Sequence, residues 1–216
     1  MRFIDYNREA ACEYARKWAH GRNPAYYDFE NLGGDCTNFA SQCLFAGVGV
    51  MNYTPDVGWF YISPDSRAAA WTEANYFRRF MLRNESVGPY GEECALGELE
   101  KGDFISLSDG ETYYHTLIVV GFEHTVPLVA AHTYDAYMRR LDSYYFEIAT
   151  PLHIIGAKNK RASPVYISLL MYFGSSMMRE GCSAKSSSKE RNPHVTPTAS
   201  ICAFLAVCIS TLLSPK

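Results

Sequence analysis

The order of the periodic segments is the feature that most constrains the fold of this chain. Apolar residues recur at helical spacing only in the first 83 residues, over 7–20, 36–46 and 68–83. Strand-like runs come later, at 103–107, 115–122, 126–132 and 144–155. Helices followed by strands predict an α+β domain in which N-terminal helices pack on an antiparallel sheet.

Capping residues predict the ends of these helices. Asn7 or Asp5 can cap the first helix, and Gly21 is expected to stop it. Gly47 is expected to end the second helix. The segments 22–35 and 48–66 read as loops, because they are rich in Gly, Pro and aromatic residues without a clear period.

The second helix begins with a cysteine that follows a flexible turn, Gly33-Gly34-Asp35-Cys36. A thiol at a helix N-terminus lies among unpaired N–H groups and near the positive end of the helix dipole, which favours the thiolate. The alternative is that Cys36 is a small buried hydrophobic residue. Cys43, one helical turn further on, is interpreted as core packing.

Two histidines accompany the strand-like runs. His115 heads the run 115–122, and His132 ends the run 126–132, with only a short connection between the runs. Adjacent antiparallel strands can place both imidazoles side by side, facing a cysteine on a helix, as in a Cys-His-polar triad. The remaining histidines, His20, His124 and His153, lack partners at informative spacing and are interpreted as surface or core residues.

With these residues in view, the chain resembles the bacterial putative amidase domain family, a branch of the papain-like, NlpC-type superfamily of cell-wall peptidases and amidases. The resemblance covers roughly residues 1–156. It is carried by Tyr6, Tyr14-Ala15, Trp18, Asn23-Pro24-Ala25-Tyr26, Gly34-Asp35-Cys36-Thr37-Asn38-Phe39-Ala40-Ser41-Gln42, Gly58-Trp59, Trp71-Thr72, Gly102-Asp103, His115-Thr116 and Ala131-His132-Thr133.

This resemblance implies a papain-like fold and a catalytic triad. It assigns the nucleophile to Cys36, the general base to His115 and an orienting role to His132. Related families use Asn, Asp, Gln or Glu in the third role, so Asp135 is an alternative to His132. In the resting enzyme Cys36 and His115 are expected to form a thiolate–imidazolium pair.

An oxyanion hole is expected around the same turn. The backbone N–H of Cys36 is the first expected donor. The second is expected from the upstream loop, where Tyr26 ranks before Tyr27 and Asn31 because it lies in the family-like Asn-Pro-x-Tyr segment. Asp35 either binds local backbone N–H groups and shapes the turn or is a simple turn residue.

Aromatic side chains flank Cys36 in the sequence and allow two interpretations. They could line a groove for a peptide or a sugar ring, or they could form core, which is the preferred interpretation for Trp71 and Phe60. These residues are Tyr26, Tyr27, Trp59, Phe60, Tyr61 and Trp71.

Composition excludes several other classes. The 216 residues, 48% of them hydrophobic, can bury one sizeable core, and a net charge of −3 without a basic cluster argues against nucleic-acid binding. The seven cysteines are scattered, with no Cys-x-x-Cys or His-Glu-x-x-His pattern. We therefore expect no disulfide framework, no metal site and no cofactor.

The sequence predicts a catalytic domain over 1–157 and a tail over 158–216 that is largely disordered or loosely helical. The apolar run 201–213 is shorter than the roughly 20 residues of a membrane span, so no stable span is expected. The first residues do not resemble a secretory signal. This predicts a cytoplasmic protein unless a leader is missing or export is non-classical.

The expected activity is therefore cysteine-dependent hydrolysis of amide bonds in peptidoglycan-type peptides, through a thioester. The nearest enzymatic alternative is an acyltransferase or transamidase on the same fold. A non-catalytic cell-wall-binding module is a third alternative. The sequence leaves the scissile bond and the oligomeric state open.

Overall fold

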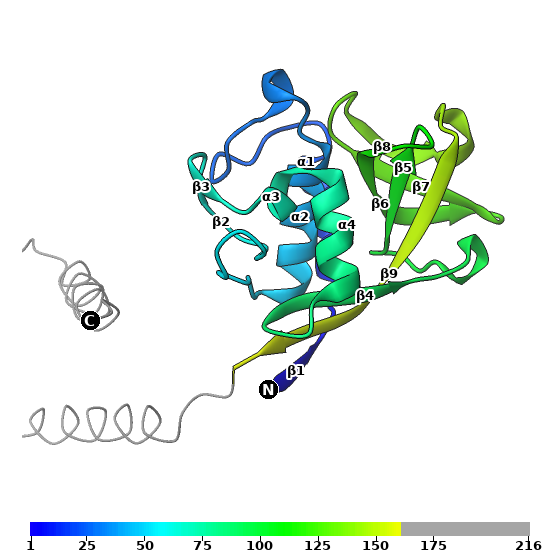
Figure 1. The fold of residues 1–216 in the computed structure, drawn as a ribbon. Helices are drawn as coiled ribbons and strands as arrows, with labels where there is room; N and C mark the ends of the chain where they lie inside the picture. Colours follow the sequence, from blue (N-terminus) through cyan, green and yellow to red (C-terminus); the bar gives the residue numbers. More distant parts are fainter. Residues whose placement is uncertain (161–216) are drawn as a thin grey trace, which may run out of the picture. The chain divides into compact units, whose positions relative to one another are not determined.

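A computed structural model describes residues 1–160 of the chain. The described part is α+β, as the sequence predicts, and its helices lie together beside a curled antiparallel sheet (Figure 1). The helices are α1 (Arg8–Trp18), α2 (Cys36–Val48), α3 (Ala69–Thr72) and α4 (Ala74–Arg83). Short 3-10 turns lie at Glu30–Leu32, Leu96–Glu98 and Leu141–Ser143.

The caps of the first two helices follow simple rules, with two corrections. The first is that α1 ends at Trp18 with Ala19 as its C-cap, before the expected stop at Gly21. The side chain of Asn7 accepts a hydrogen bond from the backbone N–H of Ala10, as predicted for the α1 cap. The predicted end of α2 at Gly47 is wrong, because α2 continues to Val48 and ends on left-handed Gly49, with φ of 64°. Gly47 instead lies where a Cβ atom would collide with the ring of Tyr6.

The third predicted helix is interrupted. Glu73 adopts an extended conformation, with φ of −120° and ψ of 130°, and divides the segment into α3 and α4. The loop expected over 48–66 also contains structure, because the backbone of Asn52 pairs with that of Trp59 and the small β2–β3 hairpin (Tyr61–Ser63 and Ser66–Arg67) begins there.

The main sheet has the strand order β1-β9-β5-β6-β7-β8, and β4 also pairs with β9. Its strands are β1 (Arg2–Asp5), β4 (Gly88–Glu93), β5 (Phe104–Ser108), β6 (Tyr113–Glu123), β7 (Val126–Ala131), β8 (Ala136–Arg140) and β9 (Ile148–Asn159). All neighbouring strands in this sheet are antiparallel. The sequence predicts β5, β6, β7 and β9 but misses β1, β4 and β8, which are short or largely exposed.

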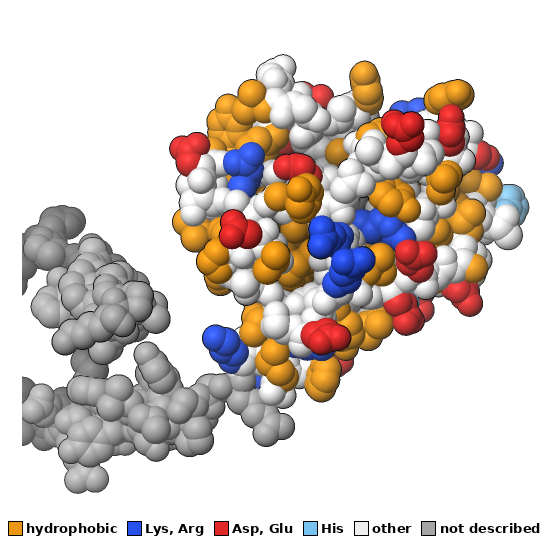
Figure 2. All heavy atoms as spheres, viewed as in Figure 1, with side chains coloured by type: hydrophobic (Ala, Val, Ile, Leu, Met, Phe, Trp, Pro, Cys, Tyr) orange, Lys and Arg blue, Asp and Glu red, His pale blue; other side chains and the backbone are white. Residues whose placement is uncertain are grey.

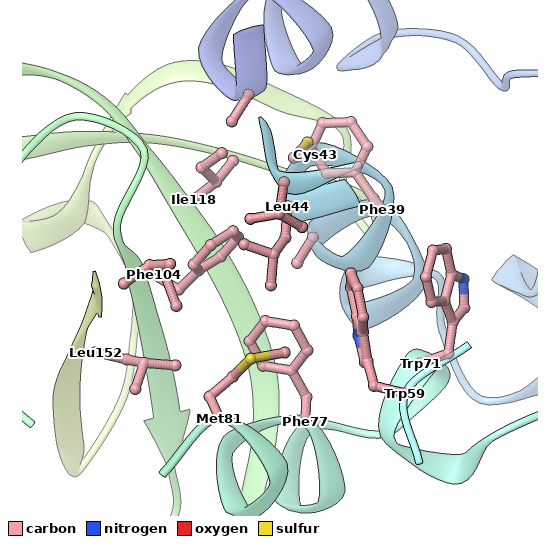
Figure 3. Close-up of a cluster of buried hydrophobic side chains, with 14 of the residues drawn as sticks. Phe39, Cys43, Leu44, Trp59, Trp71, Phe77, Met81, Phe104, Ile118 and Leu152 are labelled. Carbon is pink, nitrogen blue, oxygen red and sulfur yellow. The ribbon is translucent and has the colours of Figure 1, made fainter. Parts of the chain in front are cut away.

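Two hydrophobic clusters lie on opposite faces of the sheet. The larger cluster joins α1, α2 and α4 to the sheet, and Phe39, Leu44, Phe77 and Phe104 interdigitate in it (Figure 3). Its members also include Cys43, Trp59 and Trp71, each fully buried, so Cys43 and Trp71 are core as predicted. The smaller cluster takes the alternate residues of β5 and β6, namely Ile105, Leu107, Leu117 and Val119.

A buried carboxylate, Asp103, ties α1 to the sheet. Its Oδ1 accepts from the Arg8 guanidinium at 2.6 Å and from the Ile154 backbone N–H at 3.0 Å, and its Oδ2 lies 2.9 Å from Nδ1 of His153. His153, which lacks an expected partner in the sequence, is therefore held by Asp103. The carboxylate is fully buried, so its several donors offset the cost of its desolvation.

The boundary predicted at residue 157 falls inside β9, which runs to Asn159. The predictions for the tail, including 183–200 and the apolar run 201–213, lie outside the described residues. Within residues 1–160, the helices are all too short or too polar to cross a membrane.

Candidate active site

Cys36 is the first residue of α2 and lies against β6. Gly33 and Gly34 precede it with φ of 104° and 106°, a left-handed conformation that favours glycine and turns the chain into the helix. The thiol is 7% exposed, and its Sγ lies 4.0 Å from the carbonyl oxygen of Tyr114. The structure therefore brings the thiol to the strand position that carries His115.

The imidazole of His115 lies on the other side of that strand. Thr116 faces the helices, because its Oγ1 lies 3.0 Å from Oγ1 of Thr37 on α2. Side chains alternate along a strand, so His115 shares its face with Leu117 and packs beside Tyr144, with ring centroids 5.9 Å apart. Among residues 1–160, no hydrogen bond joins Sγ of Cys36 to the ring of His115.

Burial keeps both groups uncharged. It raises the pKa of the Cys36 thiol, and hydrogen bonds from the Thr116 backbone and the Thr37 side chain counter this only partly. Burial, with a smaller contribution from Arg139, lowers the pKa of His115 to about 4. At neutral pH this conformation therefore holds a thiol and a neutral imidazole, and it does not form the expected thiolate–imidazolium pair.

His132 does not contact His115, which corrects the expected orienting contact. Its Nδ1 lies 2.6 Å from Oδ2 of Asp35, and its Nε2 lies 2.9 Å from the carbonyl oxygen of Trp18. Both ring nitrogens are thus engaged elsewhere. The physical reason is strand register. Ile118 pairs with Ala130, and this register extended to His132 places it opposite Thr116, on the face of the sheet that meets α2 and not on the face of His115.

The hydrogen-bond partners of His132 also indicate which of its ring nitrogens carries a proton. The Trp18 carbonyl can only accept, so Nε2 carries a proton. A second proton lies between Nδ1 and the carboxylate of Asp35. That carboxylate already accepts from the Phe29 N–H at 3.0 Å and the Asn38 amide at 2.8 Å. The Asp35 carboxylate is thus fully hydrogen-bonded in its buried position, and it joins α2 to the residue that follows β7.

Asp35 thus has the first of its two expected roles, since it binds backbone N–H groups and shapes the turn. Its own backbone N–H donates to Oγ1 of Thr133 at 2.9 Å. Thr133 has a φ of 57°, which is rare for a β-branched residue. The turn before Cys36 is consequently fixed from both its side-chain and its backbone atoms.

The other predicted site residues have their contacts away from the Cys36 thiol. Asp135 forms a two-pronged contact with Arg22, at 2.9 and 3.0 Å, and does not reach His115. Tyr26 stacks on Trp71, with ring centroids 5.8 Å apart, and packs against the core. Tyr26 therefore does not contact Cys36 in this conformation, and neither Asp135 nor His132 takes the third position beside His115.

Sequence reasoning missed three residues of this network. Arg22 gathers Asp135 and nearby acids, Asn38 links Asp35 to the indole N–H of Trp71 at 2.9 Å, and Thr133 holds the Asp35 amide. Asn38 lies three residues after Asp35, a spacing that could have indicated contact across one helical turn. Nothing in the sequence pattern indicated the roles of Arg22 and Thr133.

Over the described part of the chain, no three His, Cys, Asp or Glu side chains gather closely enough to hold a metal ion.

The raised pKa of Cys36 predicts how the thiol reacts. We expect the rate of Cys36 alkylation by iodoacetamide to rise with a midpoint above the free-thiol value of about 8.5, because burial disfavours the thiolate. Peptide-resolved mass spectrometry across pH 5 to 11 measures this, with N-acetylcysteine as the reference. Reactivity that persists below pH 7 would show that Cys36 is ionised by a partner and would contradict the neutral pair.

Comparison with known proteins gives one family and one relative. A family model described as "Putative amidase domain" matches residues 5–155. The chain is 34% identical over 143 residues to "Uncharacterized protein YhbB" of Bacillus subtilis (strain 168), which covers 64% of this chain and 45% of that protein. The chain thus spans less than half of that relative's length. No solved structure matches.

Proposed function

Because the chain belongs to the putative amidase domain family, we propose that it is a cysteine-dependent amide hydrolase of the papain-like, NlpC-type class. The family description itself reaches only to amide hydrolysis. The single observation that carries the cysteine mechanism is the position of Cys36, at the N-terminus of α2 with its Sγ against the backbone beside His115.

In this mechanism Cys36 and His115 start as a neutral pair. His115 swings from its place beside Tyr144 toward the thiol and takes its proton as Sγ attacks the amide carbon. The tetrahedral intermediate collapses when the C–N bond breaks, and His115 gives the proton to the departing amine. Water, activated by His115, then hydrolyses the thioester and releases a carboxylate. With its pKa lowered to about 4, the imidazole is unprotonated at neutral pH and can accept the thiol proton, but the same burial makes it a weaker base.

The start of α2 supplies the oxyanion donor. The backbone N–H of Cys36 belongs to the first turn, where no intrahelical partner exists. Asp35 and His132 act on this donor as positioning residues, because they hold the turn that precedes it. In this proposal His132 positions the turn before Cys36 and does not orient the ring of His115.

We propose peptidoglycan-type peptides as the substrate class. Three tyrosines close to the site in sequence expose much of their rings, and they could contact an extended peptide or a sugar ring. These are Tyr114, which is 47% exposed, Tyr134 at 84% and Tyr145 at 94%. The predicted groove aromatics Trp59 and Trp71 are fully buried and cannot serve this purpose.

The test is to trap the acyl-enzyme. The protein is incubated with muropeptides from digested peptidoglycan, quenched in acid and examined for a thioester on Cys36 by mass spectrometry. Loss of the adduct on later treatment with hydroxylamine, which cleaves thioesters, identifies the bond. A Cys36 adduct and free carboxylate products support the proposal. Preferential transfer to added amines would identify an acyltransferase. Binding of muropeptides with no adduct and no product would identify a binding module.

A further inference from the structure

A cavity lies beyond the C-terminal end of α2, the end opposite to Cys36. It has a volume of about 490 Å³ and lies between the 52–58 loop, the outer face of α4 and the turn that follows α4. This volume falls in the range of ligand sites, roughly 300–1,000 Å³. Asn52, one of its lining residues, follows the C-terminus of α2, and the 13 residues of α2 span about 20 Å.

The walls of this cavity carry opposite charges. Arg79 and Arg83 lie one helical turn apart on α4, and Lys and Arg side chains gather over this helix in Figure 2. Asp56 comes from the 52–58 loop, and Glu85 comes from the turn after α4. Phe80 and Ala70, both largely buried, line the space between them.

These four charged side chains do not pair with one another. Within residues 1–160, none of them forms a side-chain hydrogen bond or an ion pair, although Arg8, Arg22, Arg78 and Arg140 all have carboxylate partners. Two arginines at i and i+4 repel each other unless an anion lies between them. The two arginines and the two carboxylates therefore line the same cavity without neutralising one another.

The position of Asp56 is fixed by its loop. The Val57 N–H donates to the Pro55 carbonyl at 2.7 Å, and Asp56 between them has a φ of 62°, which makes a γ-turn of the rare, strained type. Gly58 admits no larger residue, because a Cβ atom would collide with the carbonyl oxygens of Asn52 and Thr54. The loop thus fixes the backbone of Asp56 beside the cavity.

We propose that this cavity binds a small zwitterion, a free amino acid or short peptide, with its carboxylate on Arg79 and Arg83 and its ammonium group on Asp56 or Glu85. Charge complementarity selects this class over a simple anion, because two carboxylates line the same space. An apolar side chain of the ligand packs on Phe80 and Ala70. This site is independent of any chemistry at Cys36.

Alanyl-alanine tests the proposal by NMR titration of the full chain. We expect shifts at the amides of Gly58 and Ala70. N-acetyl-alanyl-alanine and alanyl-alanine amide each lack one charge, so each should bind about tenfold more weakly, the loss expected for one partly screened ion pair.

Matched variants identify the residues. Arg79→Gln and Arg83→Gln should each weaken binding about tenfold, and Asp56→Asn should weaken alanyl-alanine but not its amine-blocked form, since Asn also tolerates a positive φ. Arg16→Gln, a charge-matched change on α1, and Cys36→Ala should leave binding unchanged. Three results would overturn the assignment. The first is that the acetylated peptide binds as tightly as alanyl-alanine, and the second is that chemical shifts change only away from the cavity. The third, which would indicate a simple anion site, is that inorganic phosphate binds Asp56→Asn more tightly than alanyl-alanine binds the parent.

Discussion

Replacing Cys36 with alanine is expected to reduce amide hydrolysis to the uncatalysed background, because the nucleophile that forms the thioester is removed. His115→Ala is expected to lower kcat by roughly 10²–10⁴-fold, the usual contribution of a general base. KM should change less, since neither substitution removes a side chain that binds the substrate away from the scissile bond. Product release from muropeptides, followed by chromatography, measures both constants.

The control for these variants is His20→Ala, since His20 is exposed on the turn after α1. It should retain parental kcat and KM. A thermal unfolding curve of His115→Ala separates lost catalysis from lost folding, because His115 is buried and its removal leaves a small cavity. Turnover retained in Cys36→Ala would exclude the thioester mechanism and direct attention to another nucleophile.

The second large effect is on stability, at Asp35. Asp35→Ala is expected to lower the free energy of unfolding by about 3–5 kcal/mol, because it removes one partner of a buried pair and leaves several buried polar groups without their acceptor. It leaves His132 with an unpaired ring nitrogen and deprives the Phe29 N–H and the Asn38 amide of their acceptor. For a domain of this size the melting temperature should fall by roughly 6–20 °C.

A double-mutant cycle isolates the pair. Asp35→Ala combined with His132→Ala should be less destabilising than the sum of the single changes, by about 1–3 kcal/mol. Asp35→Asn should be milder than Asp35→Ala, because the amide can donate to Nδ1 of a neutral His132 and still accept from Phe29. Asp28→Ala, which removes an exposed partner of Arg22, should cost less than about 1 kcal/mol. Strict additivity would show that Asp35 and His132 act separately.

If the pair positions the Cys36 turn, Asp35→Asn should also lower kcat while the melting temperature changes little. Such a split would distinguish a positioning role from a purely structural one. An Asp35→Asn variant with parental kcat would limit the pair to folding.

The tertiary structure decided which side chains meet. Alternation along β6 sends Thr116 toward α2 and His115 toward the other cluster, an outcome set by the register of β6 in the sheet. The register of β7 on β6 places His132 on the face of Thr116, where it meets Asp35 rather than His115. The short strands β1, β4 and β8 also depend on neighbours far along the chain, so local patterns could not reveal them.

Charge states were equally beyond local prediction. A cysteine at a helix N-terminus suggests a thiolate, yet burial raises the pKa of the Cys36 thiol despite its hydrogen bonds with Thr116 and Thr37. The cavity beside α4 also requires tertiary structure, because Asp56 and Arg83 lie far apart in the sequence and no local pattern links them.

The sequence by itself determined the α+β class, the position of Cys36 at the start of a helix, the strand that carries His115 and the strand that ends just before His132. These features rest on local periodicity and turn chemistry, which act over a few residues. Only the tertiary structure decided the partner of each histidine and the protonation of the thiol. Those properties depend on strand register, desolvation and contacts between residues as distant as Asp35 and His132, which only the packed chain brings together.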